Sequence, residues 1–255
     1  VFTKNRERLL AGDIAAKFMA AVLSQSRIKA LLSEDHFSVD GTLIEAWASH
    51  QSFKRKDGKD GDGGDFHGQS RSNDTHGSTT DPDARLARKG KGKESKLAFL
   101  GSLLMDNRHD LMVSAFASVH RGTGERDDAL AMARKAKADR GDGRITLGAD
   151  KNYDTRGFVA ACRENEITPH VMQNVNRAGG SALDGRTTRH AGYEMSVALR
   201  RRIEKGIGWT KIIGGMAKTK LRGWVRVDWQ FNLVSTAYNY VRMGNLARAG
   251  AWSLP

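Results

Sequence analysis

Apolar and polar positions along this chain predict strands in its first half and alternating strands and helices in its second half. Residues 5–32 carry apolar side chains at every fourth position, which predicts one amphipathic helix. Residues 37–47 begin with the alternation of a half-buried strand. The apolar runs 96–105 and 111–119 are separated by the polar sequence DNRHD, which predicts a hairpin.

Beyond residue 120 the pattern changes period repeatedly. Short apolar runs predict buried strands at 145–149 and 168–172. Helical periodicity is found at 125–137, 154–165, about 194–213, and 224–248. Strands that are followed by alternating strands and helices indicate the α/β class, with a mixed sheet flanked by helices.

Residues 51–95 differ in composition from the rest of the chain. They are rich in Gly, Asp, Lys and Arg and contain few aliphatic side chains. A polar stretch of this length inside a domain is typical of a mobile functional loop or a disordered insert. We therefore predict a long flexible polar loop after the first strand.

The net charge of +13 is concentrated at the C-terminal end. Residues 151–255 contain 17 Lys and Arg against 7 Asp and Glu, whereas residues 1–150 are close to neutral. A basic region of this kind fits either a face that binds a polyanion such as nucleic acid or a solvated basic surface. No run of 18 apolar residues is present, so we expect no membrane partner.

Three carboxylates lie where they could do chemistry. Asp40 is inside the first predicted strand, Asp150 ends the strand 145–149, and Glu204 lies in the basic helix. A buried carboxylate is costly unless it is paired or bound to a cation. Two that meet on a sheet would favour a divalent metal, and hard oxygen ligands suit Mg²⁺ or Mn²⁺. Spacing alone does not single these three out among 29 acidic residues.

The basic helix places Arg200, Glu204 and Lys211 on one stripe, within about 40° of one another. Such a face could hold a metal ligand beside cations that bind phosphate. The alternative is a surface Arg–Glu pair four residues apart, which contributes about 0.3–0.5 kcal/mol.

Four segments together resemble bacterial insertion-sequence transposases of the DDE type, in the IS-five-like group, which have a ribonuclease-H-like catalytic core. These segments are FSVDGTLIEAWAS at 37–49, SKLAFLGSLLMDNRH at 95–109, LGADKNYDT at 147–155 and RRRIEKGIGWTK at 200–211. The last is similar to the family's C-terminal signature of an Arg, a Glu four residues later and a Lys seven beyond it. The chain departs from that signature at Val197, where the family has a Tyr.

The resemblance implies roles for these residues. Asp40, Asp150 and Glu204 would be the acidic triad that holds two catalytic Mg²⁺ or Mn²⁺ ions. The implied reaction is hydrolytic nicking at the ends of the element, followed by attack of the freed 3′-hydroxyl on target DNA. Residues that would bind DNA phosphates are Arg200, Lys211, Arg201, Arg202 and Lys151.

The resemblance also implies an organisation and partners. Residues 1–36 would be the end of a truncated N-terminal region, 37–247 the catalytic domain with its insert 51–95, and 248–255 a tail. We expect double-stranded DNA as the partner, a homodimer on that DNA, and a cytoplasmic, nucleoid-associated location. Two alternatives stay open, namely an inactive or truncated DNA-binding remnant and a nuclease that cuts without joining strands.

Overall fold

The predicted hairpin is part of a mixed sheet at the centre of the computed structural model, which describes residues 2–57, 71–90 and 92–251. The strands are β1 His36–Glu45, β2 Phe53–Arg55, β3 His76–Ser78, β4 Arg85–Arg88, β5 Ser95–Asp106, β6 Met112–Val119, β7 Ile145–Ala149 and β8 Ile167–Val171. The helices are α1 Phe2–Ala11, α2 Ile14–Ser24, α3 Ser26–Lys29, α4 Gly124–Arg140, α5 Arg156–Glu164, α6 Gly185–Thr188, α7 Tyr193–Arg200, α8 Ile203–Ile212 and α9 Trp224–Arg248. Two 3-10 turns complete the elements, η1 His50–Ser52 and η2 Lys151–Tyr153.

Strand order and direction define the fold class. The sheet runs β4-β5-β1-β7-β8, and β6 pairs with the same edge of β5 as β4 does, further along that strand. β5 is antiparallel to β1 and to β6, whereas β7 is parallel to β1 and β8 is parallel to β7. This is the arrangement of a ribonuclease-H-like sheet. The predicted α/β class is therefore confirmed.

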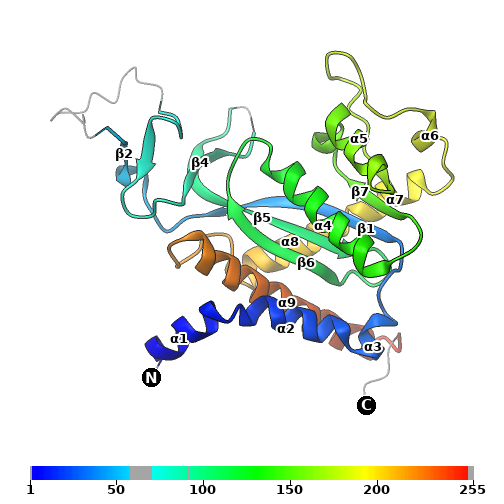
Figure 1. Ribbon diagram of the computed structural model, residues 1–255, viewed down its shortest axis with the longest axis horizontal. Coiled ribbons are helices and arrows are strands. Elements are labelled where there is room, and N and C mark those ends of the chain that lie inside the picture. Colours follow the sequence, from blue (N-terminus) through cyan, green and yellow to red (C-terminus); the bar gives the residue numbers. More distant parts are fainter. Residues whose placement is uncertain (1, 58–70, 91, 252–255) are drawn as a thin grey trace.

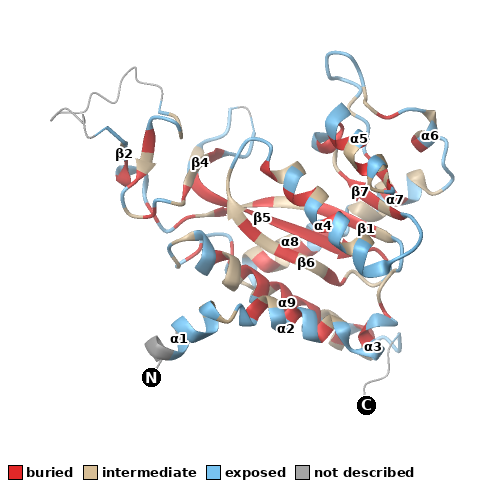
Figure 2. Ribbon diagram, in the orientation of Figure 1, coloured by how far each residue is buried: buried red, intermediate tan, exposed pale blue. Residues whose placement is uncertain are grey.

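Helices cover both faces of the sheet (Figure 1). On one face, α4 and α5 bury Val39 and Leu147 in an apolar cluster. On the other, α8 and α9 pack over Ile44 and Leu103, with Phe231 of α9 fully buried among them. Figure 2 shows that burial is concentrated along the central strands and the helix faces that meet them. Burial of both faces accounts for the nearly continuous apolar run of β5.

The N-terminal region is not the single helix that periodicity predicted. The helix is interrupted at Asp13, whose φ of 50° is left-handed, and α2 then packs against α9. Ala15, Met19 and Val22 are buried there, whereas Ile14 and Phe18 are exposed. Of the predicted apolar face, Val22 is buried whereas Ile14 and Phe18 are not, so that face is confirmed only in part.

The polar stretch 51–95 contains more structure than a flexible loop. β2 and β3 form a separate two-stranded sheet, and β4 adds a strand to the edge of the main sheet. Phe53 and Ala84 of this region are buried in the main apolar cluster, and hydrogen bonds of polar side chains add to that packing. Ser52 Oγ lies 2.7 Å from Ser78 Oγ, and Asp81 accepts from the backbone N–H of Gly223 at 3.2 Å. Residues 58–70 and 91 of the stretch lie outside the described residues.

The basic helix predicted at about 194–213 is two helices. α7 ends at Arg200 and α8 begins at Ile203, so Arg201 and Arg202 form a turn between them. The last predicted helix is present as α9, which lies alongside α2 and crosses below β6 in the view of Figure 1. Among the described residues, no helix is long and apolar enough to cross a bilayer.

Candidate active site

Two of the predicted acidic residues lie side by side on neighbouring strands. β1 and β7 are parallel, and Ser38 pairs with Gly148 at the end of their register. Continued by two residues, this register would place Asp40 opposite Asp150, which directly follows β7, and the charge of Asp150 does act on the Asp40 carboxyl. Adjacent strands are about 4.8 Å apart, so these carboxylates lie close to each other. The fold therefore brings Asp40 and Asp150 together.

Arg200 links Asp40 to Glu204, the third predicted acid. Its Nη2 donates to Asp40 Oδ2 at 3.1 Å, and its Nη1 lies 3.4 Å from Glu204 Oε1. α7 reaches this position because it crosses β7 at Gly148, where an added Cβ would lie 3.5 Å from Arg200 Cβ. Arg200 and Glu204 are therefore neighbours, as predicted, although they belong to two helices and Glu204 lies in the first turn of α8.

The Asp40 carboxyl is in an unusual electrostatic environment. Its pKa is raised to about 6: burial has the largest effect, the Arg200 guanidinium opposes it, and the negative charge of Asp150 adds to it. The backbone N–H of Gly41 donates to Asp40 Oδ1 at 2.9 Å. A carboxyl that titrates near neutral pH beside a second carboxylate is typical of a functional site.

Asp150 is held by the turn that follows it. Its carboxylate accepts from the backbone N–H of Asn152 at 2.7 Å and from Asn152 Nδ2 at 3.3 Å, which caps η2. Lys151 is exposed beside it, and Tyr153 is buried beneath it. The N–H contacts point the Asp150 carboxylate back towards the chain and leave it partly open to solvent.

One acidic residue at this site was not predicted. Glu125, in the first turn of α4, approaches β1 from the face of the sheet that α4 and α5 cover. Burial raises the pKa of its carboxyl, and the charges of Asp40 and Asp150 raise it further. From the sequence, Glu125 could be recognised only as a residue at the start of a predicted helix. The one available signal was Gly41, next to Asp40, because a glycine in a strand leaves room for a side chain from another element.

The predicted phosphate-binding residues are placed in different surroundings. Arg201 and Lys151 are exposed. Arg202 lies 3.5 Å from Asp110, in the turn between β5 and β6, rather than pairing with the acidic residues of the site. Lys211 is partly buried, and burial together with the charge of Lys89 lowers the pKa of its ammonium group.

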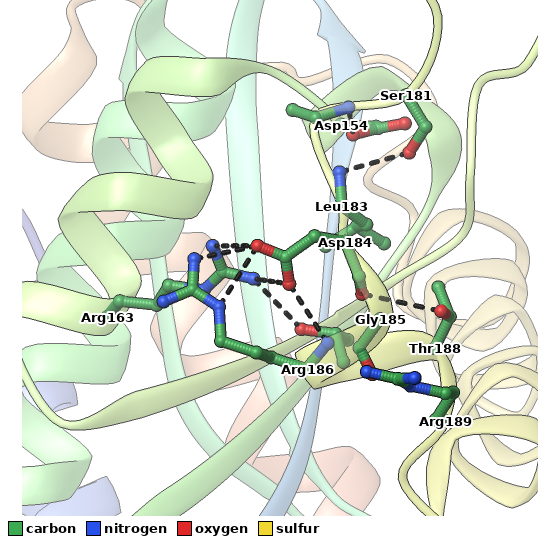
Figure 3. Close-up of polar contacts among 11 residues, drawn as sticks. Asp154, Arg163, Ser181, Leu183, Asp184, Gly185, Arg186, Thr188 and Arg189 are labelled. Carbon is green, nitrogen blue, oxygen red and sulfur yellow. Dashed lines mark hydrogen bonds and ion pairs between the residues drawn. The ribbon is translucent and has the colours of Figure 1, made fainter.

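Two other arginines of the basic C-terminal region, Arg163 and Arg186, are ion-paired with one carboxylate. Asp184 binds Arg163 at 2.9 Å and Arg186 at 2.7 Å, and Figure 3 shows the two guanidinium groups converging on its carboxylate. These hydrogen bonds hold the pKa of Asp184 well below its usual range. The excess charge of residues 151–255 therefore overstates the number of cations that are open to a polyanion.

The donor set suits a hard divalent cation. Carboxylate oxygens are the ligands that Mg²⁺ and Mn²⁺ prefer, and Asp40, Asp150 and Glu204 supply them. In the described part of the chain, no three His, Cys, Asp or Glu side chains converge closely enough to form a ready metal site. The Arg200 guanidinium supplies the positive charge between Asp40 and Glu204 in this arrangement.

Comparison with known proteins yields likeness at the level of structure only. No family model matches the chain, and no curated protein matches it. The chain is similar to a piggyBac transposase in a synaptic complex with hairpin DNA, at 8% identity over 87% of this chain and 49% of that one, with a TM-score of 0.45. It is also similar to a pre-cleavage Mos1 transpososome, at 12% identity over 95% of this chain and 63% of that one, with a TM-score of 0.27.

A third structure, the mariner Mos1 paired end complex with Mg, has 12% identity over 97% of this chain and 64% of that one, with a TM-score of 0.27. The chain spans about half the length of the piggyBac chain and less than two thirds of the Mos1 chains. Likeness this distant does not identify functional residues.

Proposed function

We propose that this chain contains the catalytic domain of a DDE transposase of the bacterial IS-five-like group, which cuts DNA at element ends and joins the ends to a target. One observation carries the proposal. Asp40 and Asp150 lie at one level of two adjacent parallel strands, and Arg200 ties Glu204 to the same point. Residues 37–247 would form that domain, with residues 1–36 as the end of an N-terminal region and 248–255 as a tail.

Asp40, Asp150 and Glu204 would hold two Mg²⁺ or Mn²⁺ ions. Bound divalent ions of this kind stabilise negative charge on the attacking and leaving oxygens of phosphoryl transfer. Asp40 would have to lose its proton to serve as a ligand, and its pKa of about 6 permits that at neutral pH. Arg200 would then be released from Asp40, and its guanidinium would become available to a phosphate of the DNA.

The exposed cations beside the carboxylates would position double-stranded DNA. Lys151, in η2, directly follows Asp150, and Arg201, in the turn before α8, directly follows Arg200; both are exposed. Arg202, in the same turn, and Lys211, in α8, would contribute to the same surface. Joining two element ends requires two active sites, so we propose that the chain acts as a homodimer on DNA.

The test is cleavage and joining of DNA. The protein is incubated with duplexes that carry the sequences flanking its coding region, in Mg²⁺ or Mn²⁺. We expect nicking and strand transfer, and we expect Asp40→Asn, Asp150→Asn and Glu204→Gln to abolish both. Glu164→Gln, at the exposed end of α5, is the matched control for loss of one negative charge. Undiminished nicking in the three site variants would contradict the proposal.

A second candidate is a DNA-binding relative that has lost catalysis. The observation that favours it is the pairing of Arg200 with both Asp40 and Glu204, which neutralises two of the three carboxylates. This candidate predicts salt-sensitive DNA binding without metal-dependent cleavage. A third outcome, nicking without strand transfer, would identify a nuclease instead.

A further inference from the structure

The hairpin that joins β4 to β5 carries basic side chains at its tip. Arg88 is paired with Ser95 where the two strands end. In the turn beyond them, the N–H of Lys93 donates to the C=O of Gly90 at 3.1 Å. Arg88, Lys89 and Lys93 are all exposed. Figure 1 shows the hairpin projecting from the sheet, so its tip is open to a partner.

Packing and hydrogen bonds fix this hairpin in the fold. β4 forms four residue pairs with β5, and Leu86 of β4 packs against the apolar cluster beneath α8 and α9. On the outer edge of β4, the Asn73 side chain donates to the C=O of Leu86 at 2.9 Å and accepts from its N–H at 2.7 Å. Because its shape is set before a partner arrives, binding through the hairpin costs little conformational freedom.

Positive charge is in excess around the tip. Lys96 and Lys218 share one carboxylate, since the Nζ atom of each lies 2.9 Å from an oxygen of Glu45. The basic hairpin surface, as we define it, consists of the exposed cations Arg88, Lys89, Lys93, Lys96, Lys218 and Lys220. With Glu45 and Glu94 as its acidic residues, this surface keeps an excess of four positive charges.

Much of that charge is unpaired. Lys89, Lys93 and Lys220 form no ion pair with any residue that the structure describes. Asp81 and Asp83 do not neutralise them, because these carboxylates accept from the backbone N–H groups of residues 223 and 224 at the start of α9. A cluster of unpaired like charges repels itself, and a bound polyanion would relieve that repulsion.

The register of β5 gives the distance from this tip to the carboxylate site. Asp40 pairs with Leu103 and Arg88 pairs with Ser95, which lies eight positions from Leu103. At about 3.4 Å per strand residue, the end of the hairpin strands is about 27 Å along the sheet from the level of Asp40. Successive phosphates of one DNA strand are about 3.4 Å apart along the helix axis, so this distance corresponds to about eight base pairs.

We infer that the basic hairpin surface is a second contact for duplex DNA, about eight base pairs from the phosphate at Asp40. The inference rests on the proposed function, because it assumes that the chain binds duplex DNA at its carboxylate site. The major groove of B-DNA admits a two-stranded ribbon, and lysines at the tip of such a ribbon contact the phosphates that line the groove. The hairpin therefore holds DNA that flanks the site, whereas Lys151 and Arg201 lie beside the carboxylates.

The test is binding to a fluorescein-labelled duplex of mixed sequence and about 30 base pairs, measured by anisotropy across a salt series. Lys89→Ala combined with Lys93→Ala should make the slope of log K against log[salt] less steep by about 1.8, because each phosphate contact contributes about 0.9. Lys17→Ala combined with Lys29→Ala is the matched control, since both lysines are exposed, on α2 and α3, and should leave the slope unchanged. A hairpin variant with the slope of the unaltered protein, or a control with the same loss, would overturn the inference.

Photo-crosslinking separates direct contact from long-range attraction. Cys162 is the single cysteine of the chain and is buried, so benzophenone maleimide labels the folded Lys93→Cys variant at position 93. On irradiation this variant should crosslink to the duplex, whereas Lys17→Cys should not. Failure of Lys93→Cys to crosslink would also overturn the inference.

Lys151→Ala distinguishes failure of this inference from failure of the proposed function. If Lys151→Ala makes the slope less steep and the hairpin variant does not, only the role of the hairpin falls. If the unaltered protein shows no salt-sensitive binding to the duplex, the proposed function falls and the inference with it.

Discussion

Arg200 holds Asp40 in an ion pair that is almost closed to solvent. The two groups are 3.1 Å apart, and their side chains are only 12% and 14% exposed. Arg200 Nε is also buried and has no hydrogen-bond partner among the described residues. The guanidinium is thus held by its carboxylate contacts, and this ion pair joins α7 to β1 together with the hydrogen bond between Ser196 Oγ and His36 Nε2 at 2.8 Å.

Replacing Arg200 should make the stability of the metal-free protein depend more strongly on pH. At pH 8 Asp40 is ionised, and Arg200→Gln would leave a buried charge unpaired at a cost of up to about 3–5 kcal/mol. At pH 5 Asp40 is protonated, because its pKa is about 6, and the loss should be much smaller. Urea denaturation at the two pH values measures both losses.

Arg202→Gln is the control for that experiment. Arg202 is 44% exposed and lies 3.5 Å from Asp110, so its loss should cost about 1 kcal/mol or less and show no such pH dependence. If Arg200→Gln lost the same unfolding free energy at pH 5 as at pH 8, the ion pair between Arg200 and Asp40 would not be what stabilises the protein at that position.

Asp40→Asn should stabilise the metal-free protein at neutral pH. The pKa of Asp40 is raised from 3.8 to about 6 in the folded state, so the folded chain binds a proton more tightly than the unfolded chain. Native stability therefore falls as pH rises from about 4 to 6 and levels off above that. Asparagine resembles the protonated acid, and by this linkage the variant should be about 3 kcal/mol more stable at pH 7 and equal near pH 4.

Unfolding free energies across this pH range, in the presence of a chelator, test that expectation. Asp127→Asn serves as the control, since its carboxylate is 53% exposed and should give a profile parallel to that of the unaltered protein. A variant that is less stable than the unaltered protein at pH 7 would mean that the Asp40 carboxylate stabilises the fold rather than straining it.

Divalent metal should stabilise the protein more at high pH than at low pH. Metal can bind only after Asp40 has lost its proton, so the rise in melting temperature caused by Mg²⁺ should increase as pH passes through about 6. Asp40→Asn should lose both the rise and its pH dependence. Thermal scans with and without Mg²⁺ at pH 5 and pH 7.5 provide the measurement, and a metal-induced rise that persists in Asp40→Asn would place the ion elsewhere.

Periodicity was a good guide to the sheet for a physical reason. β5 and β7 are buried on both faces, so their apolar runs predicted strands directly, and the polar residues between 105 and 111 predicted the turn. β1 combines alternation with a carboxylate on one face, which predicted Asp40 as a candidate. The sequence also predicted Asp150 at a strand end, where parallel neighbours bring such residues together.

Contacts between distant residues were beyond what the sequence patterns could predict. Nothing local indicates that Arg200 would bind Asp40, 160 residues away, or that Glu125 would reach β1 through the space at Gly41. The same holds for Asn239 of α9, whose amide binds both the N–H and the C=O of Met112 at 2.7 and 2.8 Å. Each of these contacts depends on packing between elements, which hydrophobic periodicity does not encode.

Cys162 should be unreactive in the folded protein. Its thiol is fully buried, and burial raises its pKa to about 12, so almost no thiolate is present at neutral pH. Iodoacetamide should therefore label the chain only after denaturation, as followed by mass spectrometry. Rapid labelling under native conditions would show that α5 separates readily from the sheet.

DNA binding should depend on salt through the exposed cations beside the carboxylates. Each phosphate contact makes the slope of log K against log[salt] more negative by about 0.9 for duplex DNA, so removing one contact makes that slope less steep by about the same amount. Arg201→Ala and Lys151→Ala should each show this reduction, because both side chains are exposed beside the centre. Lys135→Ala, on α4 and ion-paired at 2.7 Å with Asp139, is the control for loss of one positive charge. Fluorescence anisotropy across a salt series measures the slopes, and a reduction in Lys135→Ala equal to that in the other two would mean that net charge, rather than this surface, determines binding.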